Sequence, residues 1–378
     1  MKRQAYVALA AAVLLLVAVA VPQTFLTTST STSTQPAPLT DGPPLKPSTS
    51  YQFRGVAMQA QSADKNVPFE TFVDEIAQTG ANTFCLSVAA FQENGSSSSI
   101  FVDARRMPSD ERIEKLVQQA HDHKLQVAFM PIVLLENPGA GEWRGAIHPH
   151  ELSKWWEDYE NYILYYAKVA ARANVDLFVV GSELVTLEEN TDKWRGLIAK
   201  VRKIFPGKLT YSANWDHYKN IQFWNDLDIV GMTSYHDLCG DEKPTLEVLL
   251  KKWAPIKAEI LDFQRKVNRP ILFTEVGWPN LDTAAKEPWN YVRDAKGNPA
   301  LQALCFESFF ETWKDEPGVA GLFIWEWRNY AGQTGGDSDT SYFPGGKPAM
   351  QVIRKFFQSS GPWDKTPSSA PASSGSRP

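Results

Sequence analysis

The stretches Asp176-Leu-Phe-Val-Val-Gly-Ser-Glu183 and Pro270-Ile-Leu-Phe-Thr-Glu275 decide the fold class of this chain. Each is a short apolar run that ends abruptly in a glutamate. A continuous run of Val, Ile, Leu and Phe is typical of a strand that is buried on both faces of a parallel sheet. An unpaired charge in an apolar setting costs several kcal/mol, so burial alone would exclude a carboxylate there. A carboxylate at the carboxyl end of a barrel strand therefore indicates a catalytic role.

Similar runs recur along the chain and alternate with helical patterns, in which apolar residues are spaced by three and four. This alternation indicates a parallel sheet. We expect an α/β fold, a (β/α)8 TIM barrel forming a single catalytic domain. An open doubly wound sheet is the alternative, but no G-x-G-x-x-G motif follows the first strand. The expected strands are 53–60, 82–91, 126–134, 176–182, 208–214, 227–235, 270–276 and 319–327. The expected helices are 68–79, 110–123, 151–173, 191–204, 245–267, 299–314 and 347–357, with 215–226 as a weak helix.

The two ends of the chain differ in composition from the domain. Residues 1–22 combine Lys2 and Arg3 with an apolar run and the small residues Ala18-Val19-Ala20, the layout of a signal peptide. An uncleaved membrane anchor is the alternative, and either one predicts an exported protein that is secreted, periplasmic or held at the cell surface. We expect a disordered Thr/Ser/Pro-rich linker at 23–50, the barrel at 51–358 and a disordered tail at 359–378.

The overall composition argues against some kinds of binding partner. The chain has 378 residues and a net charge of −5, so it lacks the excess of basic residues that is typical of nucleic-acid-binding proteins. Its 13 tryptophans favour a carbohydrate ligand, although many of them will pack in the core. The three cysteines show neither metal-ligand spacing nor a disulfide framework. We expect no metal, no cofactor and a monomeric protein.

Glu183 and Glu275 end the fourth and seventh expected strands. In an eight-stranded barrel, their side chains would face each other across the mouth. Two such carboxylates suggest a glycoside hydrolase, in which a retaining enzyme holds them about 5–5.5 Å apart as acid/base and nucleophile. The acid must be protonated near neutral pH, so its surroundings must raise its pKa. Glu188 and Glu189, in contrast, are interpreted as part of a polar loop.

Five motifs stand at the expected strand ends: Phe53-Arg-Gly-Val56, Gly-Ser-Glu183-Leu, Ser-Tyr235, Phe-Thr-Glu275-Val-Gly-Trp278 and Ile324-Trp-Glu-Trp327. In these motifs the chain resembles clan A of the glycoside hydrolases, and within it family 113. The resemblance covers the whole expected domain and implies retaining endo-β-1,4-mannanase activity, with Glu183 as acid/base and Glu275 as nucleophile. Many clan members have Asn before the acid/base, where it binds the sugar 2-hydroxyl. Ser182 stands there in this chain, which leaves that contact unassigned.

Other candidates follow from their position at strand ends. Tyr235 ends the sixth strand, where the resemblance implies a hydroxyl against the nucleophile, and His236 follows it. Trp325 and Trp327 alternate on the last strand, so we expect them on one face, with Glu326 on the other. If their face is the lumen, at least one of the two, Trp325 or Trp327, would lie under the reacting sugar. Trp278 would supply an apolar wall beside Glu275. The remaining candidate sugar contacts are Gln59, Ser182, Asn214 and Trp215.

These residues leave three functions open. The first is a retaining glycosidase on a β-linked glycan, which would be the partner of the site. The second is a transglycosylase or another β-glycanase of the same fold. The third is a non-catalytic glycan-binding barrel, against which the presence of both glutamates argues. The loops 136–150 and 278–298 are long enough to shape either an open cleft or a closed pocket.

Overall fold

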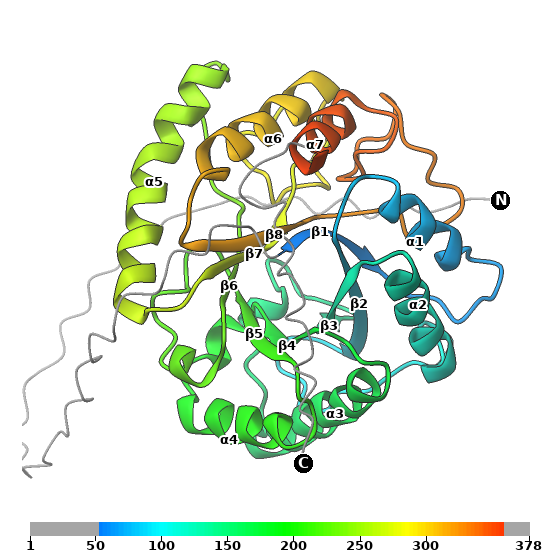
Figure 1. Ribbon diagram of the computed structural model, residues 1–378. Coiled ribbons are helices and arrows are strands. Elements are labelled where there is room, and N and C mark those ends of the chain that lie inside the picture. Colours follow the sequence, from blue (N-terminus) through cyan, green and yellow to red (C-terminus); the bar gives the residue numbers. More distant parts are fainter. Residues whose placement is uncertain (1–52, 359–378) are drawn as a thin grey trace, which may run out of the picture. The chain divides into compact units, whose positions relative to one another are not determined.

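The computed structural model describes residues 53–358, in which eight parallel strands close into a barrel in chain order (Figure 1). Each strand pairs with its neighbours in sequence, and β8 pairs back with β1, with Phe53 opposite Gly321. This closure confirms the (β/α)8 barrel and excludes the open sheet. The strands are β1 (Phe53–Gln59), β2 (Thr83–Gln92), β3 (Gln126–Leu135), β4 (Leu177–Ser182), β5 (Lys208–Ala213), β6 (Val230–Thr233), β7 (Ile271–Val276) and β8 (Val319–Ile324).

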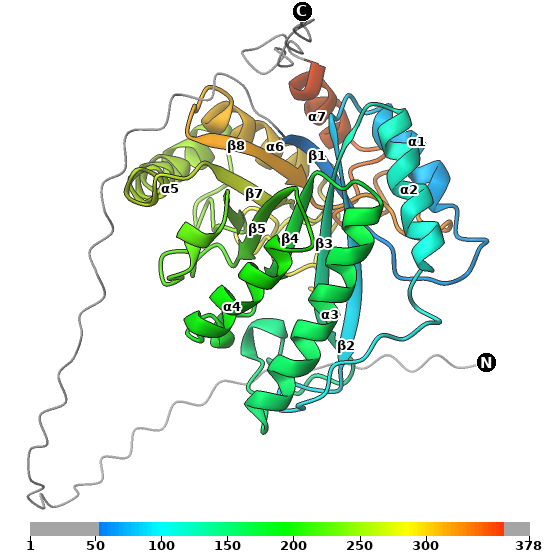
Figure 2. The same cartoon turned by 60° about the horizontal axis from the view of Figure 1, so that its bottom comes forward.

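The helices lie around the outside of the strands in both views (Figures 1 and 2). Seven α-helices lie where the sequence predicts them, whereas the weak helix expected at 215–226 is reduced to the single 3-10 turn η3 (Trp224–Asp226). Two further 3-10 turns, η1 (Arg144–Ala146) and η2 (Val185–Leu187), follow β3 and β4. The α-helices are α1 (Phe69–Ala77), α2 (Asp110–Asp122), α3 (Leu152–Arg172), α4 (Thr191–Arg202), α5 (Leu246–Val267), α6 (Pro299–Trp313) and α7 (Pro348–Gln358).

Amphipathic spacing explains how the helices cover the barrel. In α2, the buried residues are Ile113, Leu116, Val117 and Ala120, the same four that the spacing of three and four predicts. The side chain of Ser109 accepts a hydrogen bond from the Arg112 amide and so caps the first turn. In α3, the tryptophans and most of the tyrosines are buried, which makes this aromatic stripe part of the core.

Two strands are shorter than predicted, and both differences affect the site. The sixth strand was expected at 227–235 but is Val230–Thr233, so Tyr235 follows the strand and does not end it. The eighth was expected at 319–327 but ends at Ile324. Trp325, Glu326 and Trp327 therefore lie in the connection that follows β8, where the two-residue alternation of a strand no longer fixes which way a side chain points.

The predicted leader, linker and tail lie outside the described residues. Between residues 53 and 358, no helix combines the length and the apolar character needed to cross a membrane. All three cysteines, Cys85, Cys239 and Cys305, lie in the described part and are buried free thiols. They belong to the packed interior and form no disulfide.

Candidate active site

Glu183 and Glu275 both lie buried at the carboxyl ends of their strands. Glu275 is within β7, and Glu183 directly follows β4, where its amide donates to the Ser212 carbonyl at 2.8 Å. Glu183 has a φ of 53°, a left-handed conformation that few residues other than glycine adopt. Such backbone positions cluster at functional sites. The local geometry therefore turns the Glu183 side chain away from the course of the strand.

Arg144, from η1 in the connection after β3, links the two glutamates. Its Nη2 atom lies 2.5 Å from Oε2 of Glu183 and 3.6 Å from Oε1 of Glu275. Those two oxygens cannot be further apart than the sum of the two distances, about 6.1 Å. The sequence predicts that loop 136–150 could shape the cleft, but nothing in its pattern singles out Arg144. The arginine is brought to the carboxylates only by the path of the loop.

Glu275 is held by further polar contacts. The Tyr235 hydroxyl donates to Oε2 of Glu275 at 2.8 Å, the contact that the family resemblance implies. Burial and the negative charge of Glu183 raise the pKa of Glu275, while Arg144 and the bond from Tyr235 act in the opposite direction. Beside Glu275, the hydroxyls of Ser212 and Thr274 hydrogen-bond at 2.7 Å between β5 and β7, across the barrel interior.

A third carboxyl group, Glu326, belongs to the same region. Its Oε2 accepts a 2.8 Å hydrogen bond from Nε2 of Gln59, whose Oε1 accepts one from Gln61. Burial raises the pKa of Glu326 to about 7, and its charge contributes to raising the pKa of Glu275. Gln59 is thus placed in the site region, but Glu326 was expected on the opposite face and is found near the glutamate pair.

Trp327 contacts α1 and the connection after β8. Its Nε1 donates to Glu75 of α1 at 3.1 Å, and its ring packs edge-on against Phe343 at 5.0 Å. Since β8 ends before either tryptophan, the strand alternation on which the expected shared face with Trp325 depends does not apply. Trp325 lies next to β7, because its amide donates to the Val276 carbonyl at 2.8 Å.

Trp278 is also not placed as the sequence predicts. Its side chain is 0% exposed and packs edge-on against Phe306 and Phe309 of α6, at 5.1 and 6.2 Å between ring centroids. A side chain without exposed surface has no face for a sugar, so the expected wall beside Glu275 is wrong. Trp278 instead packs between α6 and the end of β7.

An aromatic group follows β5, β6 and β7. Trp215 stacks on Trp289, with ring centroids 6.2 Å apart and planes inclined by 15°, and meets His236 edge-on at 5.0 Å. Burial lowers the pKa of His236 to about 4, so this ring is neutral near pH 7. Asn214 donates to Asp216 at 2.7 Å beside them. Trp289 is 47% exposed and was not singled out from the sequence, because its loop carries no periodic pattern.

Glu188, expected on a polar loop, is buried. Its Oε1 accepts a 2.9 Å hydrogen bond from the Tyr211 hydroxyl, which itself accepts one from the Leu184 amide. Burial raises the pKa of Glu188 to about 8. The chain Glu188–Tyr211–Leu184 fixes the backbone directly after Glu183. No local sequence signal shows this, because Glu188 sits among polar residues.

Several buried polar atoms near the glutamates have no hydrogen-bond partner within residues 53–358. They include Nε of Arg144, Oγ of Ser182, Oγ of Ser234 and Oε1 of Glu275. Buried polar groups are normally satisfied, so a group of such atoms in one region calls for an explanation. Ser182, one of the candidate sugar contacts, is among these residues.

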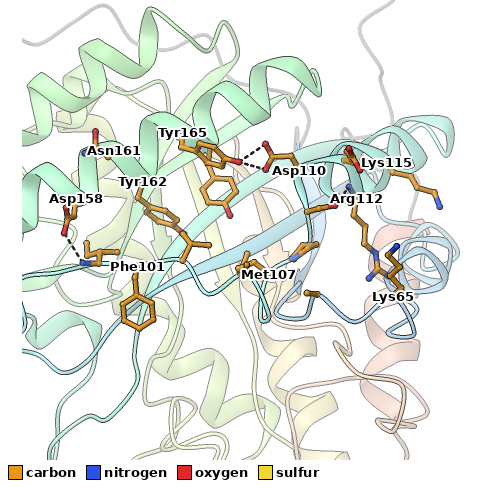
Figure 3. Close-up of a pocket in the computed structure, with 18 of the residues that line it drawn as sticks. Lys65, Phe101, Met107, Asp110, Arg112, Lys115, Asp158, Asn161, Tyr162 and Tyr165 are labelled. Carbon is orange, nitrogen blue, oxygen red and sulfur yellow. Dashed lines mark hydrogen bonds between the residues drawn. The ribbon is translucent and has the colours of Figure 1, made fainter.

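A pocket of about 1330 Å³ lies away from the two glutamates and is lined by α3, the start of α2 and the connection before α2 (Figure 3). Phe101, Met107 and Tyr162 give it an apolar lining, and the Tyr165 hydroxyl bonds to Asp110 at its edge. Neither Glu183 nor Glu275 lines it.

Comparison with known proteins identifies the family to which the fold is similar. The model of Glycoside Hydrolase Family 113 matches residues 57–347. The family 113 β-mannanase from Alicyclobacillus acidocaldarius, solved in complex with ManMIm, is 25% identical with a TM-score of 0.74; the match covers 82% of this chain and 99% of that one. A complex structure of a family 113 β-1,4-mannanase is 26% identical with a TM-score of 0.71, covering 81% and 99%. No curated protein sequence matches the chain.

Proposed function

Because the chain belongs to glycoside hydrolase family 113, we propose that it cleaves β-1,4-mannan by double displacement, with Glu275 as nucleophile and Glu183 as acid/base. One observation carries the retaining mechanism: facing oxygens of the two carboxylates are at most about 6.1 Å apart. Retaining enzymes hold their carboxyl groups about 5–5.5 Å apart, whereas inverting enzymes need about 6.5–9.5 Å. The bound of about 6.1 Å lies below the range of inverting enzymes, so it supports the retaining mechanism.

In the first step, Glu275 attacks the anomeric carbon while Glu183 gives its proton to the departing glycosidic oxygen. The sugar is then esterified to Glu275, and the leaving chain carries the proton. In the second step, Glu183 takes a proton from water, whose oxygen attacks the anomeric carbon and releases Glu275. The hydrogen bond from Tyr235 favours the ionised Glu275 that both attack and release require.

The proposal of mannan as substrate rests on relatives. The family 113 structures that match at 25–26% identity are described as β-mannanases. The stacked pair Trp215 and Trp289 fits this class, because an exposed indole face binds the apolar face of a sugar ring. We assign Ser182 and Gln59, polar residues at the ends of β4 and β1, as contacts to sugar hydroxyl groups.

We also propose that the enzyme acts outside the cell. Residues 1–22 have the composition of a signal peptide or anchor, and 23–50 that of an extended linker. A polymeric glycan is too large to enter a cell intact, so an exported enzyme suits the substrate. N-terminal sequencing of the exported protein distinguishes the two alternatives for residues 1–22. A chain that begins near residue 22 has lost a signal peptide, whereas a chain that retains Met1 keeps the segment as an anchor.

Transglycosylation is the second candidate, because a sugar hydroxyl can replace water in the second step. Product analysis at high substrate concentration separates the two, since products longer than the substrate arise only by transfer. A non-catalytic barrel would bind glycans without cleaving them. This alternative would be supported if the unmodified protein bound a glycan but showed no turnover of it.

The decisive experiment is hydrolysis of soluble manno-, gluco-, xylo- and galacto-oligosaccharides, with Glu183→Gln and Glu275→Gln as controls. We expect cleavage of the manno-series, lost in both variants, with thermal unfolding unchanged. Proton NMR of the first product should show the β-anomer. An initial α-anomer would refute the retaining mechanism, and cleavage of another series alone would refute mannan as substrate.

A further inference from the structure

Arg144 occupies the space in which the reaction must take place. Its Nη2 atom contacts carboxylate oxygens of both Glu183 and Glu275. In a retaining glycosidase, the anomeric carbon and the glycosidic oxygen lie between these two carboxyl groups. A guanidinium nitrogen cannot share that space with a sugar ring. The arrangement seen here is therefore that of an enzyme whose reaction centre is filled by its own side chain.

The contact between Arg144 and Glu183 leads to the same conclusion. Nη2 of Arg144 donates to Oε2 of Glu183 at 2.5 Å, a charge-assisted hydrogen bond. In the first chemical step, the carboxyl group of Glu183 must instead face the leaving oxygen, to which it gives a proton. Arg144 must therefore leave Oε2 of Glu183 before that oxygen can meet the substrate.

We propose that Arg144 is a substrate-displaced counter-ion. In the free enzyme, it pairs with both glutamates, and the incoming glycan drives it out of the gap as the turn at η1 withdraws. Arg144 is thus a positioning residue that sets the charge of the free site, and its release is part of substrate binding. This inference rests on the proposed retaining glycosidase function.

The turn η1 that carries Arg144 is closed by its own backbone hydrogen bonds. The Ala146 and Ile147 amides donate to Trp143 and Arg144, so the turn closes on itself. Before it, Gly141 has a φ of 77° and no atoms within contact of its missing side chain, which marks a point of backbone freedom.

Both flanks of the turn are anchored to the connection after β2. On one side, the Glu142 carboxylate accepts the Gly95 amide at 3.2 Å. On the other, the His148 amide donates to the Gly95 carbonyl at 2.7 Å. The Trp143 side chain, 41% exposed, lies against Gly145. Residues 143–146 lie between these two anchors, so the proposed withdrawal of Arg144 requires a shift of this segment alone.

Displacement has a consequence for the pH profile. Arg144 lowers the pKa of Glu275, against burial and the charge of Glu183. The nucleophile must be ionised, so activity falls as the pH drops through that pKa. Among the described groups that act on Glu275, Arg144 is the only cation. Those groups are Arg144 on η1, Glu183 after β4, Tyr235 after β6, Glu326 and Tyr342 after β8, and Cys85 on β2.

The test is the pH dependence of the wild-type enzyme and of Arg144→Met on a manno-oligosaccharide. The profile of kcat/KM reports the free enzyme, and that of kcat reports the substrate complex. If substrate expels Arg144, its removal shifts the acidic limb of kcat/KM upward by about one pH unit and leaves the acidic limb of kcat in place. Arg105→Met is the matched control, because Arg105 is an exposed arginine paired with Asp103.

Each other outcome overturns the inference. Equal shifts of both limbs would mean that Arg144 stays beside Glu275 in the complex. No shift of either limb would mean that it does not hold the glutamates in solution. Should Arg144→Met not fold, Arg144→Lys keeps a shorter cation, and we expect a smaller shift confined to kcat/KM. Hydrolysis by the wild type is measured first, so loss of the proposed function is distinguished from failure of the displacement.

Discussion

The hydroxyl of Tyr235 donates a 2.8 Å hydrogen bond to Oε2 of Glu275, joining the segment after β6 to the carboxylate on β7. Both side chains are buried, and burial works against the charged state of Glu275. A hydrogen bond to an ionised acceptor is worth about 1.5–3 kcal/mol. The bond therefore opposes the burial and the charge of Glu183 that raise the pKa of Glu275.

Tyr235→Phe should lower kcat/KM by roughly tenfold to a hundredfold, the rate equivalent of that hydrogen bond. The acidic limb of the pH profile should move upward, because the pKa of Glu275 rises when the bond is lost. Steady-state kinetics across pH check both effects. Tyr165→Phe is the control, since its exposed hydroxyl bonds to Asp110 away from the glutamates. Equal losses in the two variants would contradict the assignment.

Glu188 should make stability depend on pH. Burial raises its pKa to about 8 in the folded protein, against about 4.3 when unfolded. The folded state then binds the proton more tightly, so the stability from this group is complete below about pH 4 and is lost as the pH rises through about 8. The Tm of the wild type should fall relative to Glu188→Gln across this window. A constant difference in Tm would argue against a buried titrating carboxyl group.

Two glycines should respond to alanine in opposite ways. A Cβ at Gly277 would lie 2.1 Å from the Trp325 carbonyl oxygen, so Gly277→Ala must push β7 and the end of β8 apart. We expect a loss of about 1–3 kcal/mol in the free energy of unfolding. Gly196, exposed on α4, has no atom within contact, and Gly196→Ala should add about 0.5–1 kcal/mol. Urea denaturation of both variants measures the contrast, and equal effects would contradict it.

Trp289 should contribute to glycan binding without contributing to folding. Its exposed indole stacks on Trp215, so Trp289→Ala should raise KM by a few-fold up to about tenfold, with kcat and Tm little changed. The control is Phe101→Ala. Phe101 is 45% exposed but lines the pocket between α3 and the start of α2, away from the glutamates. A matching rise of KM for Phe101→Ala on long glycans would instead identify that pocket as a second binding surface.

The positions of Glu183 and Glu275 could be predicted because they depend on the strands alone. A carboxylate after four or five buried apolar residues is conspicuous in sequence, and parallel strands of a closed barrel end at the same face. The eight strands were therefore enough to bring these two residues together. Tyr235 belongs to the same set through the family resemblance, and the structure places its hydroxyl against Glu275.

The residues that were missed or misplaced lie in connections. Arg144 and Glu188 reach the site through loops whose path no periodicity describes. The strand alternation does not reach Trp327 because β8 ends three residues early, and Trp278 was misplaced because a residue just past β7 can pack outward as easily as inward. In each case, the direction of the side chain depends on backbone angles that are set by distant contacts.

The sequence by itself determined the barrel and the strand ends that carry the two glutamates, because both follow from short-range periodicity and the burial of apolar runs. Tertiary structure alone decided what surrounds those glutamates. Arg144, Glu326 and the Glu188–Tyr211 pair come from different connections, and their charges act only once the fold brings them within a few ångströms. Electrostatic interaction depends on distance and burial, and neither of these can be read from positions along a chain.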